Sequence, residues 1–284
     1  MPAHNAHRPV RFIILTRART GSRMLIDLLK SHSDTQMFYE LFNLDSIPRE
    51  EMMEAVDDPA KYLERRLYCD YPENIKAVGF KIFYYQASLQ AVYPNSPDHL
   101  AISETTPELR AKIMDLHDYL REHRKGLSGF EKDFSKVWKR LVEDKELRVI
   151  HLKRRNILET FLSLKRAFML NKWHSAKDEP PTSQPAVKLG YDECLHAFTQ
   201  TTKWEKEYDE LFKSHPKLEL FYENICDDLD PETRRVLDFL GLEHQKLTTP
   251  MRKQNNQKLS EAISNYWELK EQFKGTPWIK FFED

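Results

Sequence analysis

Residues 11–26 form the segment that most constrains what this chain can fold into. Within it, residues 12–15 (Phe-Ile-Ile-Leu) are an unbroken apolar run, too short for an independent helix and typical of a buried parallel strand. After this run and a short turn, apolar residues recur at helical spacing: Leu25, Leu28 and Leu29. A buried strand, a tight turn and a helix in this order predict an α/β fold built on a parallel sheet.

The turn between the predicted strand and helix is basic and contains a glycine. It consists of Arg17, Ala18, Arg19, Thr20, Gly21, Ser22 and Arg23. A helix N-terminus presents unpaired N–H groups and a partial positive charge, so a phosphate is its natural occupant. Gly21 lets the backbone approach an anion closely, and glycine is scarce, with only 7 in 284 residues. The segment therefore predicts an anion-binding loop.

This loop differs from the ATP- and GTP-binding phosphate loop, which has the pattern G-x-x-x-x-G-K-[ST]. The leading glycine is missing, and no lysine stands between Gly21 and Ser22. Without that lysine and its Mg²⁺-binding hydroxyl, triphosphate chemistry is disfavoured, and a single phosphate-type group fits the shorter loop better. A small-molecule kinase of the phosphate-loop type remains an alternative.

A second anion site is predicted from a similar strand and helix later in the chain. Residues 149–152 are apolar enough for a buried strand, and Asn156 is a suitable N-cap for the helix that follows. Ser163 lies eight residues after Arg155, so an arginine at the strand end and a serine on the helix can converge on one phosphate. Either Arg154 or Arg155 can supply the guanidinium, and we favour Arg155.

A third basic segment, Arg252-Lys253-Gln254, lies near the C-terminus. It follows a predicted strand near residue 221, a loop, and a helix with Asp230 at its N-cap and Gly241 at its C-terminal cap. Taken alone, the first loop is as typical of a solvated connection as of a site, and the other two motifs are more typical of solvated surface charge. Their combination in one chain favours a functional site.

The three motifs together resemble sulfotransferases that use 3′-phosphoadenosine 5′-phosphosulfate (PAPS), and bacterial carbohydrate sulfotransferases of the trehalose and nodulation-factor type in particular. Residues 16–22 resemble the 5′-phosphosulfate loop of that family, with Arg23 in place of a second threonine or serine. Arg155 and Ser163 resemble its 3′-phosphate site. Arg252 and Lys253 resemble the segment that closes over this phosphate, although Gln254 replaces the family's glycine.

The resemblance implies a P-loop-like central parallel sheet flanked by helices, with inserted helical segments. It also implies PAPS as co-substrate, 3′-phosphoadenosine 5′-phosphate (PAP) as product, and no metal. The acceptor would be a hydroxyl of a carbohydrate, a glycolipid or a similar small molecule. A non-catalytic nucleotide-binding regulator remains an alternative from another functional class.

In-line sulfuryl transfer needs a base for the acceptor hydroxyl and cations near the leaving phosphate. Arg19 and the loop amides can supply the positive charge. We choose Glu40 as the base because aromatic and aliphatic neighbours can raise a carboxyl pKa, and because related enzymes place a glutamate at a similar distance after their loop. Lys81, near the end of another predicted strand, is the second catalytic candidate. Three histidines are alternatives for the base: His32, His151 and His174.

Length and patterning predict one large domain over residues 10–284, after a flexible N-terminus at residues 1–9. Helices are expected around residues 44–71, punctuated by Pro48 and Pro59, and at 191–213. A helical insertion is expected at about residues 100–146, interrupted at 126–129, and a proline-containing substrate lid at about residues 172–190. Adenine or sugar stacking by Trp138 or Trp173 is left open.

Composition excludes several partner classes. The 44 Lys and Arg residues balance 45 Asp and Glu residues, so no electrostatic footprint for nucleic acid is present. Three widely spaced cysteines show neither metal-ligand nor disulfide spacing: Cys69, Cys194 and Cys226. The sequence contains neither an apolar signal core at its start nor a run long enough to span a membrane, so we expect a cytoplasmic protein. The oligomeric state is left open, and a homodimer is one alternative.

Overall fold

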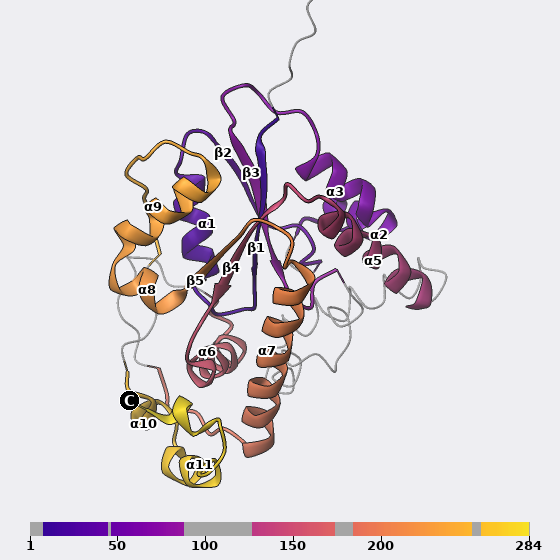
Figure 1. The fold of residues 1–284 in the computed structure, drawn as a ribbon. Helices are drawn as coiled ribbons and strands as arrows, with labels where there is room; N and C mark the ends of the chain where they lie inside the picture. The colour runs from indigo at the N-terminus through magenta and orange to yellow at the C-terminus, as the bar shows by residue number, and fades with distance from the viewer. Residues whose placement is uncertain (1–7, 45–46, 88–126, 174–183, 252–256, 284) are drawn as a thin grey trace, which may run out of the picture.

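The computed structural model describes residues 8–44, 47–87, 127–173, 184–251 and 257–283. Its centre is a five-stranded sheet in the order β2-β3-β1-β4-β5, and every pair of neighbouring strands is parallel (Figure 1). The strands are β1 Val10–Thr16, β2 Thr35–Glu40, β3 Ala77–Phe83, β4 Arg148–Lys153 and β5 Lys217–Phe221. This confirms the α/β fold, and it brings the segments that follow β1 and β4 to the same edge of the sheet, where open α/β sheets bind ligands.

Helices cover both faces of the sheet. They are α1 Ser22–Lys30, α2 Arg49–Asp57, α3 Pro59–Leu67, α5 Leu127–Glu143, α6 Ile157–Leu170, α7 Tyr191–Leu211, α8 Tyr222–Asp227, α9 Leu229–Leu240, α10 Leu259–Ala262 and α11 Tyr266–Gln272, with a final 3₁₀ turn at Ile279–Phe282. Figure 1 shows α1, α8 and α9 on one side of the sheet, and α2, α3 and α5 on the other. Helices α6 and α7 lie near the carboxyl edge, and the C-terminal helices α10 and α11 lie beyond them.

Alternate residues of the strands are buried in two different cores, as expected when both faces of a sheet are covered. Ile13 and Phe80 belong to the core beneath α2, α3 and α5, whereas Phe12 and Ile14 belong to the core beneath α1 and α9. A third core joins α6 and α7 to the C-terminal helices through aromatic side chains such as Phe198. Helices are therefore packed against both faces of the sheet, so the strand ends at its carboxyl edge hold the attached loops in defined positions.

Several local predictions are confirmed. Pro48 is the N-cap residue of α2 and Pro59 is the first residue of α3. The Asn156 side chain caps α6 by accepting a hydrogen bond from the Glu159 N–H, and Gly241 ends α9 with a positive φ of 68°.

Three local predictions are wrong. The segment after β5 is helix α8, not a loop, and α9 begins at Leu229 after Asp228, so Asp230 is inside the helix. Pro231 permits this because it stands in the first turn, where the helix does not need its missing N–H. Helix α5 also continues through Gly129, because the roughly 1 kcal/mol cost of a helical glycine is small beside the burial of its apolar face.

Only part of the predicted lid can be described, because residues 174–183 lie outside the described ranges. Its later part is held in place: the Val187 N–H donates to the Ala262 carbonyl at 2.9 Å, and the Ser264 N–H donates to the Val187 carbonyl at 3.0 Å. Of the predicted insertion, the part that can be described is α5, which packs its buried side chains into the core shared with α2 and α3.

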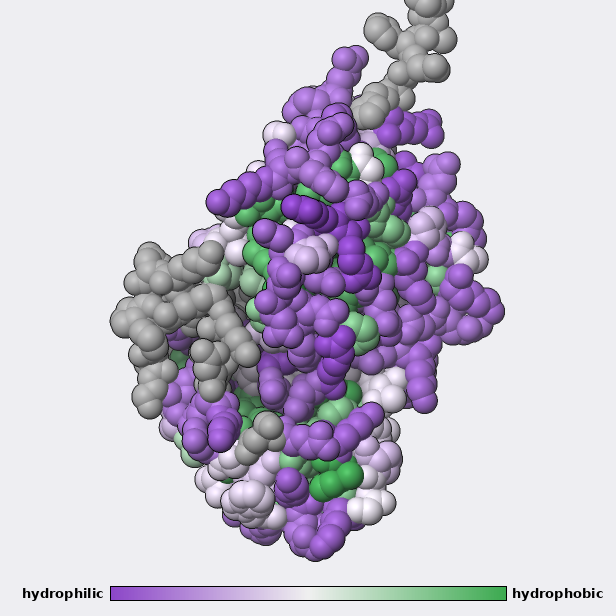
Figure 2. All heavy atoms as spheres, turned by 60° about the vertical axis from the view of Figure 1, so that its left-hand side comes forward, coloured by the Kyte–Doolittle hydropathy of each residue, from purple (hydrophilic) through white to green (hydrophobic). Residues whose placement is uncertain are grey.

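The molecular face seen in Figure 2 is largely hydrophilic, with apolar residues in small separate patches. None of the helices in the described ranges is both long enough and apolar enough to cross a membrane.

Candidate active site at the carboxyl edge of the sheet

The segment between β1 and α1 has a backbone that depends on glycine. Arg19 and Gly21 both adopt left-handed φ angles, of 71° and 77°. A Cβ atom added to Gly21 would lie 2.3 Å from Cδ2 of Tyr222, the first residue of α8. Glycine is therefore required at position 21 for two reasons: it adopts the left-handed φ angle without strain, and its lack of a Cβ atom leaves room for the tyrosine ring.

Threonine hydroxyls lock the start of this loop to the sheet. Thr16 Oγ1 donates to the Leu152 carbonyl at 2.6 Å and lies 2.6 Å from Thr20 Oγ1. Thr20 Oγ1 in turn donates to the Arg17 carbonyl at 3.0 Å. The loop is thus tied to two adjacent central strands, and Ser22, buried behind it, begins α1.

The two predicted anion-binding motifs meet at Arg19. Its Nε donates to Oγ of Ser163, on α6, at 3.0 Å. Arg154, directly after β4, donates from Nη1 to the Arg19 carbonyl at 3.3 Å. The Arg154 guanidinium lies 4.6 Å from the centre of the Tyr222 ring and is paired with Glu159. The strand-end arginine, the helix serine and the loop therefore form one cluster.

This cluster is electropositive. Burial, together with the nearby charge of Arg154, lowers the pKa of Arg19 to about 10. Two guanidinium groups held close together favour an anion between or beside them. The residues present therefore fit a phosphate or phosphosulfate group.

Three predicted ligands have side chains that point elsewhere in this structure. Arg155 is half-exposed (52%), and its Nη1 lies 3.9 Å from Glu223 Oε2. Arg17 is buried and donates to Thr201 on α7. Arg23 donates to Asp27 one turn further along α1 and lies over the Tyr39 ring.

The remaining predicted ligands are a small loop residue and a basic pair. Ala18 packs against Phe83 and Phe168 in a small apolar cluster. Arg252 and Lys253 lie outside the described residues.

The two catalytic candidates Glu40 and Lys81 form an ion pair, with 2.5 Å between Glu40 Oε1 and Lys81 Nζ. The pair depends on a β-bulge, because Phe38 pairs with Phe80 whereas Glu40 pairs with Lys81, which leaves Tyr39 as an extra residue. Regular pairing would have turned Glu40 to the opposite face of the sheet, toward the apolar core. The Glu40 carboxylate therefore contacts the charged Lys81 side chain, and the prediction that apolar neighbours surround this carboxylate is wrong.

Gln86 is a site residue that the sequence analysis missed. Its Nε2 donates to Glu40 Oε2 at 2.7 Å, and the residue is only 2% exposed. No motif signals this contact, because it arises from the turn after β3.

Two of the three histidine candidates lie in the described residues, and their hydrogen bonds are to groups outside this cluster. His32 is buried at the other end of β2, where its Nε2 lies 2.9 Å from the Glu243 carbonyl and its Nδ1 accepts from the Asp34 N–H at 3.1 Å. His151 is fully buried between Tyr84 and Asp209, and burial lowers its pKa. His174 lies outside the described residues.

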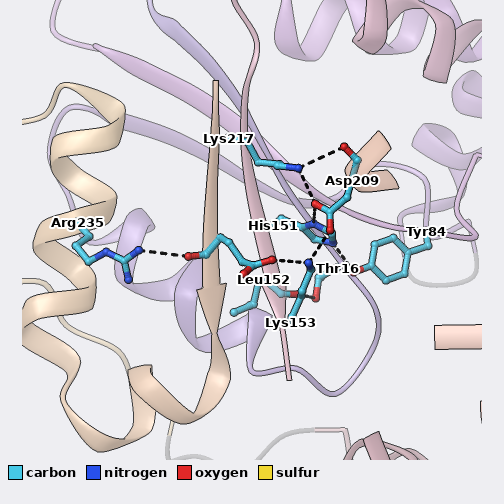
Figure 3. Close-up of polar contacts among 9 residues, drawn as sticks. Thr16, Tyr84, His151, Leu152, Lys153, Asp209, Lys217 and Arg235 are labelled. Carbon is cyan, nitrogen blue, oxygen red and sulfur yellow. Dashed lines mark hydrogen bonds and ion pairs between the residues drawn. The ribbon is translucent and has the colours of Figure 1, made fainter. Parts of the chain in front are cut away.

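His151 is the buried end of a polar network on the α7 side of the sheet, whose acidic members and Lys217 are partly exposed (Figure 3). Asp209 accepts from Lys153 Nζ at 2.8 Å and from Lys217 Nζ at 2.6 Å. Its hydrogen bond with His151, followed by those with the two lysines, lowers the pKa of Asp209. One turn earlier on α7, burial raises the pKa of Glu205 to about 7, opposed by the charges of Lys153 and Arg17.

The two tryptophans proposed for stacking have different environments. Trp138 lies partly buried on α5 and donates from Nε1 to the Gln86 carbonyl at 3.0 Å. Trp173 is 36% exposed, and its carbonyl accepts a hydrogen bond from Arg19. Of the two, Trp173 is the one that contacts the anion-binding loop.

No group of three or more His, Cys, Asp or Glu side chains in the described ranges is arranged to hold a metal ion.

The chain is similar over nearly its whole length to known proteins of one family. The model of the sulfotransferase domain family matches residues 9–279. Nodulation protein H of Rhizobium meliloti (strain 1021) is 25% identical over 288 residues, which cover 99% of this chain and 98% of the relative. Nodulation protein H of Rhizobium tropici is 25% identical over 285 residues, which cover 99% of this chain and 96% of the relative. The crystal structure of a sulfotransferase from Alicyclobacillus acidocaldarius matches with a TM-score of 0.46 at 13% identity, covering 97% of this chain and 94% of that one.

Proposed function

Because the chain belongs to the sulfotransferase domain family, we propose that it transfers a sulfuryl group from PAPS to a hydroxyl of a carbohydrate, a glycolipid or a similar small acceptor. The observation that carries the proposal is the contact between Arg19 and Ser163, which joins the loop motif to the second anion motif. PAPS has two separated anionic groups, a 5′-phosphosulfate and a 3′-phosphate, and two adjoining cationic motifs suit such a molecule. The carbohydrate class rests on the resemblance to bacterial carbohydrate sulfotransferases and is supported by the match to nodulation proteins.

In this proposal Glu40 accepts the proton of the acceptor hydroxyl while the hydroxyl oxygen attacks sulfur. A new sulfur–oxygen bond forms to the acceptor, the sulfur–oxygen bond to the phosphate breaks, and PAP leaves with the electron pair. Lys81, which is paired with Glu40, stabilises the group in transfer. Arg19 and the loop amides face the charge that develops on the leaving phosphate, a role that preorganised donors perform without a metal.

The 3′-phosphate is assigned to Ser163 together with an arginine at the end of β4. Resemblance to the family favours Arg155, whereas the contact between the Arg154 side chain and the loop backbone favours Arg154. Arg252 and Lys253 complete the proposed site by resemblance alone. Tyr222 supports the loop through its packing against Gly21.

The test is sulfuryl transfer from labelled PAPS to a panel of saccharides and glycolipids, in wild-type protein and in Glu40→Gln. We expect the variant to bind PAP almost as well as wild type but to turn over roughly 10²–10⁴-fold more slowly, because general-base catalysis is lost. Glu207→Gln, an exposed position on α7, is the matched control and should keep full activity. A fully active Glu40→Gln protein would remove Glu40 from the mechanism.

A further inference from the structure

Gln86 lies in the turn after β3 and contacts only one of the two carboxylate oxygens of Glu40, whereas Lys81 contacts the other. We propose that Gln86 is a positioning residue that fixes the orientation of the Glu40 carboxylate for proton transfer. The inference rests on the proposed role of Glu40 as the base.

The direction of the hydrogen bond is fixed by the backbone. Gln86 Oε1 accepts from the Phe83 N–H at 2.9 Å, and a backbone N–H can only donate. The amide nitrogen must therefore be the end that faces Glu40 Oε2, at 2.7 Å. A flipped amide would place two acceptors against each other and leave the Phe83 N–H facing a donor.

The turn that carries Gln86 is itself held from several directions. The Gln86 N–H donates to the Phe83 carbonyl at 2.9 Å, and the Gln86 carbonyl accepts from Trp138 Nε1 on α5 at 3.0 Å. The neighbouring Tyr84 is anchored on both sides, by its N–H to the Thr16 carbonyl at 3.1 Å and by its carbonyl to the Tyr208 hydroxyl at 2.5 Å. The donor therefore has little freedom to follow Glu40, so Glu40 must adjust to it.

Each oxygen of the Glu40 carboxylate therefore has its own partner: the Lys81 ammonium group contacts Oε1, and the Gln86 side-chain amide donates to Oε2. The Gln86 side chain that holds Oε2 is itself almost fully buried. A catalytic group displaced by 1 Å can cost about 10²-fold in rate. Removal of the amide should therefore act on turnover through the position of Glu40.

The test is a double-mutant cycle between Gln86→Met and Glu40→Gln, measured as kcat and as the KM for PAPS. We expect Gln86→Met to lower kcat about 10- to 100-fold with KM within about twofold of wild type. In the Glu40→Gln background the same change should lower kcat no further, because there is no base left to position. Gln36→Met, in the same strand as Glu40, is the matched control and should keep wild-type kcat.

Gln86→Met also removes the acceptor of the Phe83 N–H, so Gln86→Glu provides a second variant that keeps an acceptor there but cannot donate as a carboxylate. It should be folded and should lower kcat at least as much as Gln86→Met. Wild-type kcat in Gln86→Met, or equal losses from Gln86→Met with and without Glu40, would overturn the inference. Wild-type kcat in Glu40→Gln itself would instead overturn the proposed base, which distinguishes the two failures.

Discussion

Gly21→Ala should damage both the stability and the anion-binding loop of this protein. The new methyl group would lie 2.3 Å from Cδ2 and 2.7 Å from Cε2 of Tyr222, distances that force either the ring or the loop to move. The substitution would also place alanine at a φ of 77°, which L-residues other than glycine rarely adopt. Steric overlap and backbone strain are therefore both expected.

Gly275 separates these two effects. It has the same φ of 77°, but a Cβ added to it would meet no atom within 4 Å. Gly275→Ala should therefore cost only the left-handed backbone penalty, about 1–2 kcal/mol. Gly21→Ala should cost this and an overpacking term of about 1–3 kcal/mol, for a total of about 2–5 kcal/mol.

Urea unfolding measures the difference in the free energy of unfolding between the two variants, and calorimetric titration measures the affinity of each for PAP. Gly21→Ala should be less stable than Gly275→Ala by about 1–3 kcal/mol, which is the overpacking term alone, and only Gly21→Ala should lose PAP affinity. Equal destabilisation with equal PAP affinity would refute the conclusion that the Tyr222 ring shapes the loop.

Three further predictions concern other parts of the site and its support. Arg154→Ala and Arg155→Ala should be compared by titration with PAP. Replacing the arginine that binds the 3′-phosphate should weaken PAP binding by about 1.5–3 kcal/mol, and an unchanged affinity would show that the replaced arginine is not the ligand. Burial raises the pKa of Glu205 from the ordinary glutamate value of 4.5 to about 7 in the folded state, so stability should fall as pH rises between these values. Glu205→Gln should accordingly be more stable than wild type at pH 8, by up to about 3 kcal/mol, and nearly equal at pH 4.5; urea unfolding at both values checks this, and a difference independent of pH contradicts it. Turnover with PAPS should be unchanged by EDTA, and a loss that Mg²⁺ restores would contradict a metal-free mechanism.

The strands and helices that build the site could be predicted because their signals are local. The run at residues 12–15 is apolar throughout because the strand is buried on both faces, and Asn156 and Gly241 mark helix ends by their own chemistry. The two anion motifs were recognised for the same reason, since each is a strand end followed by the first turns of a helix. The structure places the two motifs in contact through Arg19 and Ser163.

Side-chain direction could not be predicted, because it depends on partners far along the chain. Arg17 and Arg19 are two residues apart in one loop, yet the first is buried against α7 and the second reaches α6. Glu40 faces Lys81 only because a bulge at Tyr39 shifts the pairing of β2 with β3, and a bulge depends on both strands. Gln86 could not be predicted, because a single glutamine after a strand matches no sequence motif.

The central claim is that one cluster at the carboxyl edge binds two separate anionic groups of a single nucleotide. Calorimetric titration of the purified protein with PAP, 5′-AMP and ATP in EDTA tests it most directly. We predict tight binding of PAP and a large loss of affinity for 5′-AMP, which lacks the 3′-phosphate. No binding of PAP, or a preference for ATP once Mg²⁺ is restored, would contradict the claim and favour a kinase.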